Sequence, residues 1–109
     1  MSFPASFFFP HTVSIRALAG GGGMRPSYFG PETVIAEVKD EAQLIRTADG
    51  AEITSSTQVT VPLATIVPLG SLVTVWPGQG AAERESAVLR VGRDENPPPL
   101  PSHLVLYLK

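Results

Sequence analysis

The feature that most constrains the fold is a series of short segments in which apolar and polar residues alternate, with proline or glycine between them. The first, residues 12–18, places Val13, Ile15 and Ala17 on one face. A period of two sends successive side chains to opposite faces and predicts a half-buried strand. The 109 residues include 11 prolines and 10 glycines, spread between these segments. Such frequent chain breakers favour an all-β chain over a helical one.

Six further segments are predicted as strands, either by the same alternation or by their position next to a turn. They are residues 33–39, 40–47, 53–61, 72–76, 85–91 and 103–109. Residues 40–47 also contain good helix formers, but the Asp49-Gly50 turn signal beside the long alternating segment makes them a strand of a hairpin. Residues 81–91 are compatible with a helix or a strand. We predict a strand from Glu85, because Ala87, Leu89 and Val91 would share a face.

The segments between these strands are predicted as turns and loops. Turns are expected at Pro68-Leu69-Gly70-Ser71 and at residues 77–80, and loops at residues 20–31, 62–71 and 92–102. The last loop contains Pro97-Pro98-Pro99-Leu100-Pro101, which we interpret as a rigid connection between strands. The alternative is a polyproline segment that docks onto a partner.

A chain of 109 residues and 11.5 kDa indicates one domain. Closing its strands on themselves removes free sheet edges, so we predict a small single-domain β-barrel of six or seven strands with long Gly- and Pro-rich loops. Residues 1–10 form an N-terminal aromatic arm in this interpretation, and residues 11–109 form the barrel.

Composition limits the function. The chain has eight basic and ten acidic residues, and its net charge is −2. Because there is no excess of positive charge to neutralise many phosphates, tight nucleic-acid binding is not expected. The absence of cysteine excludes disulfides, thiolate zinc sites and cysteine nucleophiles. The apolar residues 7–9 are too few for a secretory signal, so we expect synthesis in a cytosol. The uncharged stretch between Glu52 and Glu83 is divided by prolines and predicts strand–loop–strand instead of a membrane span.

No catalytic residue, metal site or cofactor is predicted. His11 and His103 lie at strand ends without ligand spacing, and the carboxylates at Asp40 and Glu41 lie in a polar segment. The four glycines at residues 20–23 lack the Gly-Lys-Ser/Thr that a phosphate-binding loop requires.

Two segments are candidates for contacts between subunits. Three consecutive aromatic side chains in an extended segment cannot all face one core, and aromatic residues anchor interfaces. We therefore predict subunit or partner contacts at Phe7, Phe8, Phe9 and Trp76. A flexible interface or channel loop is predicted at Gly20, Gly21, Gly22, Gly23, Met24 and Arg25.

Three segments together resemble the head-to-tail stoppers, or head-closure proteins, of tailed phages. Residues 44–56 (LIRTADGAEITSS) are similar to the family's Asp-Gly hairpin and the Ser-containing strand after it. Residues 68–75 (PLGSLVTV) resemble its glycine turn and following strand, and residues 100–108 (LPSHLVLYL) resemble its C-terminal strand. The resemblance extends over most of the chain, from His11 to Lys109.

This resemblance implies a non-enzymatic virion protein at the head–tail interface, assembled in the host cytoplasm. Its copies would form a ring, a hexamer or a dodecamer, that joins the portal or adaptor protein to the tail terminator or tail tube and helps retain packaged DNA. Double-stranded DNA would pass through that ring without sequence recognition, and no membrane would be involved. The alternatives are another connector or tail component, such as an adaptor or tail terminator, and a monomeric β-barrel binding module.

Overall fold

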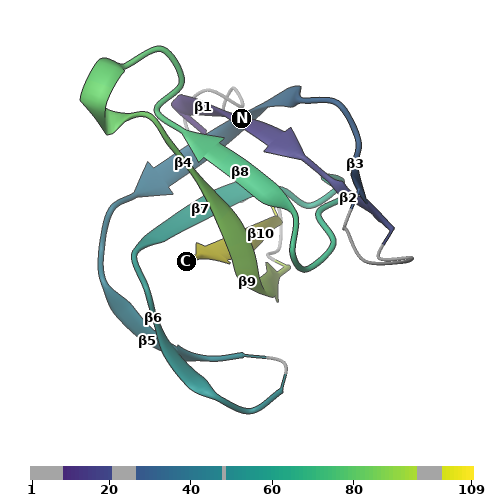
Figure 1. Ribbon diagram of the computed structural model, residues 1–109, viewed down its shortest axis with the longest axis vertical. Helices are drawn as coiled ribbons and strands as arrows, with labels where there is room; N and C mark the ends of the chain where they lie inside the picture. Colours follow the sequence, from purple (N-terminus) through teal and green to yellow (C-terminus); the bar gives the residue numbers. More distant parts are fainter. Residues whose placement is uncertain (1–8, 21–26, 48, 96–101) are drawn as a thin grey trace, which may run out of the picture.

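A computed structural model describes residues 9–20, 27–47, 49–95 and 102–109 of the chain (Figure 1). Six antiparallel strands close into a barrel, and the predicted all-β barrel is therefore confirmed. In order around the barrel they are β1 (His11–Arg16), β4 (Glu32–Lys39), β7 (Thr57–Pro62), β10 (His103–Leu108), β9 (Arg84–Asp94) and β8 (Leu72–Val75). A short 3₁₀ turn, η1 (Gly80–Ala82), precedes β9.

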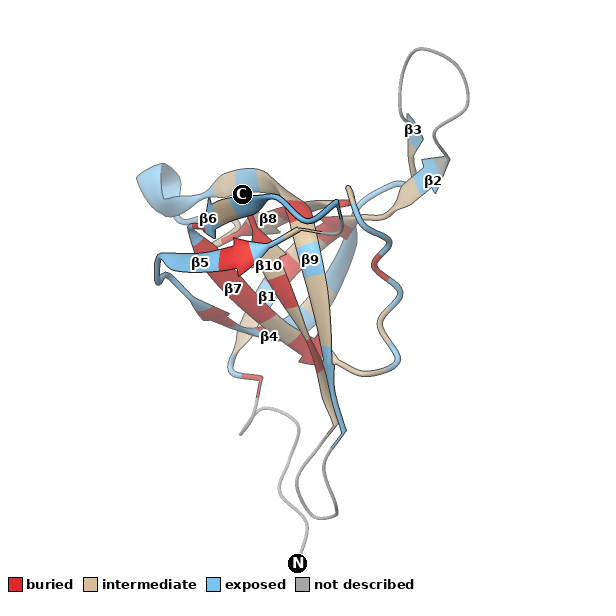
Figure 2. Cartoon of the chain, turned by 90° about the horizontal axis from the view of Figure 1, so that it is seen from below, coloured by how far each residue is buried: buried red, intermediate tan, exposed pale blue. Residues whose placement is uncertain are grey.

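Two further pairs of strands lie outside the closed sheet. β2 (Leu18–Gly20) pairs with β3 (Ser27–Tyr28), and β5 (Gln43–Arg46) pairs with β6 (Glu52–Ser55). Both pairs project from the barrel: β5–β6 extends below it in Figure 1, and β2–β3 stands away from it in Figure 2. The molecule is accordingly elongated, with extents of 50 × 32 × 26 Å.

The barrel interior is filled by aliphatic side chains from alternate positions of the strands. Directly paired residues face it together, as Val13 does with Val34 and Val59 with Leu106. The buried set is Val13, Ile15, Ala36, Val38, Val59, Val61, Val67, Val73, Val75, Val88, Leu104, Leu106 and Leu108. Valine predominates because a six-stranded barrel leaves little interior volume for larger side chains.

The regular alternation predicted for β9 is interrupted by a β-bulge. Tyr107 pairs with Arg90, but Leu108 pairs with Val88, so Leu89 is an extra residue in a β-bulge. The bulge interrupts the alternation: Val88 is buried and Val91 packs against the core, whereas Ala87 and Leu89, which were predicted to share a face with Val91, are half-buried. Alternation read along a single strand cannot detect such a shift.

β9 also continues into the segment predicted as a loop. Gly92 and Asp94 pair with Val105 and His103, so the prediction of a loop starting at residue 92 is wrong. Gly92 lies against the ring of Tyr107, from which an added Cβ would be 3.7 Å away. Here glycine serves close packing within a strand instead of ending it.

Other strand boundaries differ by a few residues. The predicted strand 12–18 ends at Arg16, and the predicted strand 53–61 is divided into β6 and β7 at Ser56. Gly20, predicted as part of a loop, belongs to β2 and pairs with Ser27. The turn Pro68–Ser71 is confirmed, since the Ser71 N–H donates to the Pro68 carbonyl over 3.1 Å and Gly70 has a φ of 88°.

Candidate interaction surfaces

The base of the β5–β6 hairpin is fixed to the barrel by buried polar side chains. The Ser55 hydroxyl donates to the Leu108 carbonyl over 2.7 Å, and the Gln58 amide donates to the Glu41 carbonyl over 2.9 Å. Ser55 and Gln58 are 0% and 7% exposed. Buried polar groups that are fully hydrogen-bonded define one geometry, so the hairpin leaves the barrel at a fixed position.

The tip of this hairpin is a tight turn, as its Asp-Gly pair predicts. The Gly50 N–H donates to the Thr47 carbonyl over 2.9 Å, and Gly50 has a φ of 88°. The Asp49 carboxylate accepts a hydrogen bond from the Thr47 hydroxyl. This bond, with a second from the Ala51 N–H, holds the pKa of Asp49 below its ordinary value.

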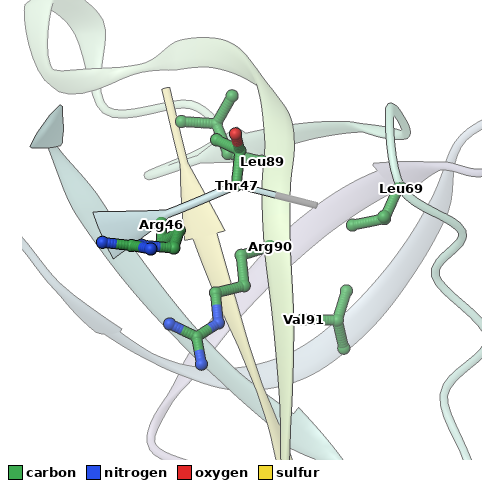
Figure 3. Close-up of a pocket in the computed structure, with 6 residues that line it drawn as sticks. All are labelled: Arg46, Thr47, Leu69, Leu89, Arg90 and Val91. Carbon is green, nitrogen blue, oxygen red and sulfur yellow. The ribbon is translucent and has the colours of Figure 1, made fainter. Parts of the chain in front are cut away.

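A cleft of about 450 Å³ separates the hairpin from the outer side of β9 (Figure 3). We call it the arginine cleft; it is lined by Arg46, Thr47, Leu69, Leu89, Arg90 and Val91. The Arg46 guanidinium lies 3.4 Å from Glu52, and the Arg90 guanidinium lies over the Tyr107 ring, 5.7 Å from its centroid. The cleft thus combines two cations with aliphatic walls.

A second hollow, of about 650 Å³, lies beside the start of β4. We call it the apolar groove, because Phe29, Ile35 and Ile66 border it with 61%, 40% and 81% of their surfaces exposed. Glu32 is the charged residue among the described residues that line it. Large exposed apolar side chains gathered around a hollow are typical of interaction surfaces.

Trp76, predicted as an interface residue, is half-buried and packs against the core. Its indole Nε1–H donates to Asp40 Oδ2 over 2.9 Å, and its ring meets that of His11 edge-on at 4.9 Å between centroids. Asp40 also accepts hydrogen bonds from Arg84 and Thr57. Trp76 has a φ of 53°, a strained conformation for so bulky a residue.

Asp40 is the hub of this network, which we call the Asp40 network. Partial burial acts to raise the pKa of Asp40, but the hydrogen bonds from Trp76, Arg84 and Thr57 and the charge of Arg84 outweigh it and hold the pKa below 3.8. The carboxylate is therefore ionised at neutral pH and links β7 and β9 to the turn after β8.

The remaining predicted interface residues are only partly described by the structure. Phe9 is 6% exposed and so is buried within the monomer. Gly20 lies in β2, at the start of the predicted channel loop. Outside the described residues lie Phe7, Phe8, Gly21, Gly22, Gly23, Met24 and Arg25.

Neither hollow was predicted from the sequence. A usable signal exists for the apolar groove, since Phe29 and Ile66 are large apolar residues inside loops bounded by Gly30-Pro31 and by Pro62 and Pro68. For the arginine cleft no local signal exists, because Arg46 and Arg90 are 44 positions apart and line one hollow only in the folded chain.

The histidines lie at strand ends and contact neighbouring strands. His11 Nδ1 accepts a hydrogen bond from the Val38 N–H over 3.0 Å, and His103 Nε2 lies 3.3 Å from Asp94 Oδ2. Within the described ranges, no three His, Asp or Glu side chains gather in a way that could hold a metal ion. No helix among the described residues has the length and hydropathy needed to cross a membrane.

The surface features that stand out are therefore two hollows with exposed apolar borders and two projecting hairpins. Comparison of the chain with protein-family models, with curated proteins and with solved structures finds no match.

Proposed function

We propose that this chain is a structural virion protein of a phage head–tail connector, a head-to-tail stopper whose copies form a ring between the portal or adaptor and the tail. The observation that carries the proposal is the distribution of exposed apolar side chains. Phe29, Ile35 and Ile66 border the apolar groove, Leu69 lines the arginine cleft, and Leu44 lies on the β5–β6 hairpin. Interaction surfaces account for all five.

The barrel suits a ring subunit for a further reason. Its closed sheet presents no free strand edge within the barrel, so copies would associate through the hairpins and side-chain surfaces instead of through open-ended sheet extension. The all-β fold favours a stopper over an adaptor, which we expect to be mainly helical.

The slightly negative net charge of the chain supports the proposal that DNA moves through the ring. With a net charge of −2, the chain has no basic excess to hold the phosphate backbone, so double-stranded DNA would slide through the ring. The partners on this proposal are further copies of the chain, the portal or adaptor, and the tail terminator or tube, in a virion assembled in the host cytoplasm.

The test is deletion of the gene from the phage that encodes the chain, followed by electron microscopy of the lysate. We expect separate heads and tails, with heads that lose their DNA, and complementation by the intact gene should restore joined particles. Joined, infectious particles from the deletion strain would overturn the proposal. A cryo-microscopy map of wild-type particles that places the chain away from the neck would overturn it equally.

A further inference from the structure

The two hollows are lined by different strands of the barrel. The closed order is β1-β4-β7-β10-β9-β8, so β4 and β9 are three strands apart in either direction. In a six-stranded barrel this places them across the axis from each other. Ile35 on β4 is exposed next to the core residue Ala36, and Arg90 on β9 is exposed opposite Tyr107. The apolar groove and the arginine cleft are therefore two distinct surfaces of the chain, and the loop that carries Ile66 and Leu69 contributes to both.

The two surfaces are also complementary in charge. The apolar groove contributes Glu32, and the outward side of β4 adds exposed Glu37; the arginine cleft contributes Arg46 and Arg90. Arg46 is already paired with Glu52, but within the described part of the chain neither Glu32 nor Arg90 forms an ion pair. Glu32 on one surface and Arg90 on the other are thus left for partners.

Their apolar content matches as well. Phe29 and Ile66 stand out from the border of the groove, whereas the arginine cleft is a hollow of about 450 Å³ with Leu69 and Leu89 in its walls. Pockets of roughly 300–1,000 Å³ with mostly apolar walls are the usual receptors for inserted groups. Exposed apolar side chains next to an acid on one surface can therefore pack into an apolar hollow next to a cation on the other.

We infer that the apolar groove of one copy packs against the arginine cleft of the next, with Glu32 of the first copy beside Arg90 of the second. The inference rests on the proposed function, because it specifies which surfaces join neighbours in the ring. A contact between two different surfaces of the same chain is head-to-tail, and it generates a closed ring when the rotation between copies closes. The occupant of each surface is a second copy of this chain.

The first test uses charge reversal, with self-association measured by sedimentation velocity and by chemical cross-linking. Glu32→Arg and Arg90→Glu should each weaken association roughly tenfold or more, because each places like charges together at the contact. The double variant E32R/R90E should associate again. A mixture of the two single variants should also associate, since each contact then joins opposite charges. Glu85→Arg, exposed on β9 outside both surfaces, is the matched control and should have no effect.

The second test uses the absence of native cysteine. Thr33→Cys lies at the groove and Leu69→Cys in the cleft, and neither removes the proposed charge pair. In purified particles that carry both substitutions, a short bismaleimide should produce a ladder of multimers. Each single-cysteine variant should give none, because like surfaces do not meet.

The outcomes separate this inference from the proposed function. Particles that contain the chain at the neck but yield no ladder would overturn the groove-to-cleft contact and leave the connector role standing. Dimers from a single-cysteine variant would also overturn it, since they indicate contact between like surfaces. Absence of the chain from the neck would overturn the proposed function itself.

Discussion

Trp76 and Asp40 are joined by a hydrogen bond of 2.9 Å from the indole Nε1–H to Oδ2, across 36 positions of the chain. This contact accompanies a positive φ at Trp76, the one such value at a non-glycine position among the described residues. The bond to Asp40 and the edge-on packing on His11 hold the strained residue in place. Trp76 is therefore part of the structure of the folded chain itself.

Removing the indole N–H should destabilise the barrel modestly. Trp76→Phe keeps an aromatic ring but loses the donor to Asp40, so we expect the free energy of unfolding to fall by about 1 kcal/mol. Urea denaturation of the purified chain measures this. The variants W76F and D40A should be non-additive when combined, because both remove the same bond; full additivity would contradict the Asp40 network.

Asp40 should make stability depend on pH in the acidic range. Its pKa is lower in the folded chain than the ordinary value of 3.8, so its stabilising effect is fully present above that value and is lost as pH falls through the folded pKa. Asp40 and Arg84 side chains are 46% and 39% exposed, and solvent screening limits the effect to about 1 kcal/mol or less.

The measurement is urea unfolding of wild type and Asp40→Asn at pH 7 and near pH 2. Wild type should be more stable than D40N at pH 7, and the difference should shrink at the acidic pH. A difference that persists unchanged would show that the charge of Asp40 does not contribute.

The barrel core should be sensitive to cavity formation. Leu106 is 0% exposed and pairs with Val59 and Val91 on its two sides, so Leu106→Ala leaves a cavity in a small interior. We expect a loss of 2–5 kcal/mol in the free energy of unfolding, roughly the range for buried leucines. Leu44→Ala, at a residue 64% exposed on the hairpin, is the control and should change stability by less than about 0.5 kcal/mol.

The sequence was sufficient to predict the barrel because its strands carry a local signal. Val59 and Val61, for example, face the core as their alternation predicts, and the turns at Gly50 and Gly70 have the positive φ that their residues favour. What the sequence did not reveal depends on partners in other strands. Leu89 is bulged because of its register with Tyr107 and Leu108, and the short pair β2–β3 forms from segments too short for a periodic pattern.

The candidate surfaces were less predictable than the fold for the same reason. Phe9 was predicted to contact a subunit or partner because it is one of three consecutive aromatic residues, yet it is buried within the chain itself. The arginine cleft needs residues from the hairpin, β9 and the turn at Leu69 to converge, and no local pattern encodes that convergence.

The β5–β6 hairpin should depend on its buried anchor at Ser55. Ser55→Ala removes the hydroxyl that donates to the Leu108 carbonyl, so local opening of the hairpin should become easier by about 1 kcal/mol while the barrel stays folded. Hydrogen exchange should show faster exchange in β5 and β6 only. Ser56→Ala, which removes an exposed bond to the Lys109 carbonyl, is the matched control and should leave exchange unchanged.

Two variants can test Phe9 and residues 1–8 of the N-terminal arm separately. Because Phe9 is buried, Phe9→Ala should destabilise the monomer by about 3 kcal/mol or more, whereas deletion of residues 1–8 should leave its unfolding transition in place. If Phe7 and Phe8 contact neighbouring copies, as their sequence predicts, the same deletion should block assembly of the connector in the phage. Normal particles from a phage that carries the deletion would reject the contact role of the arm, and an unfolded deletion variant would show that the arm belongs to the barrel itself.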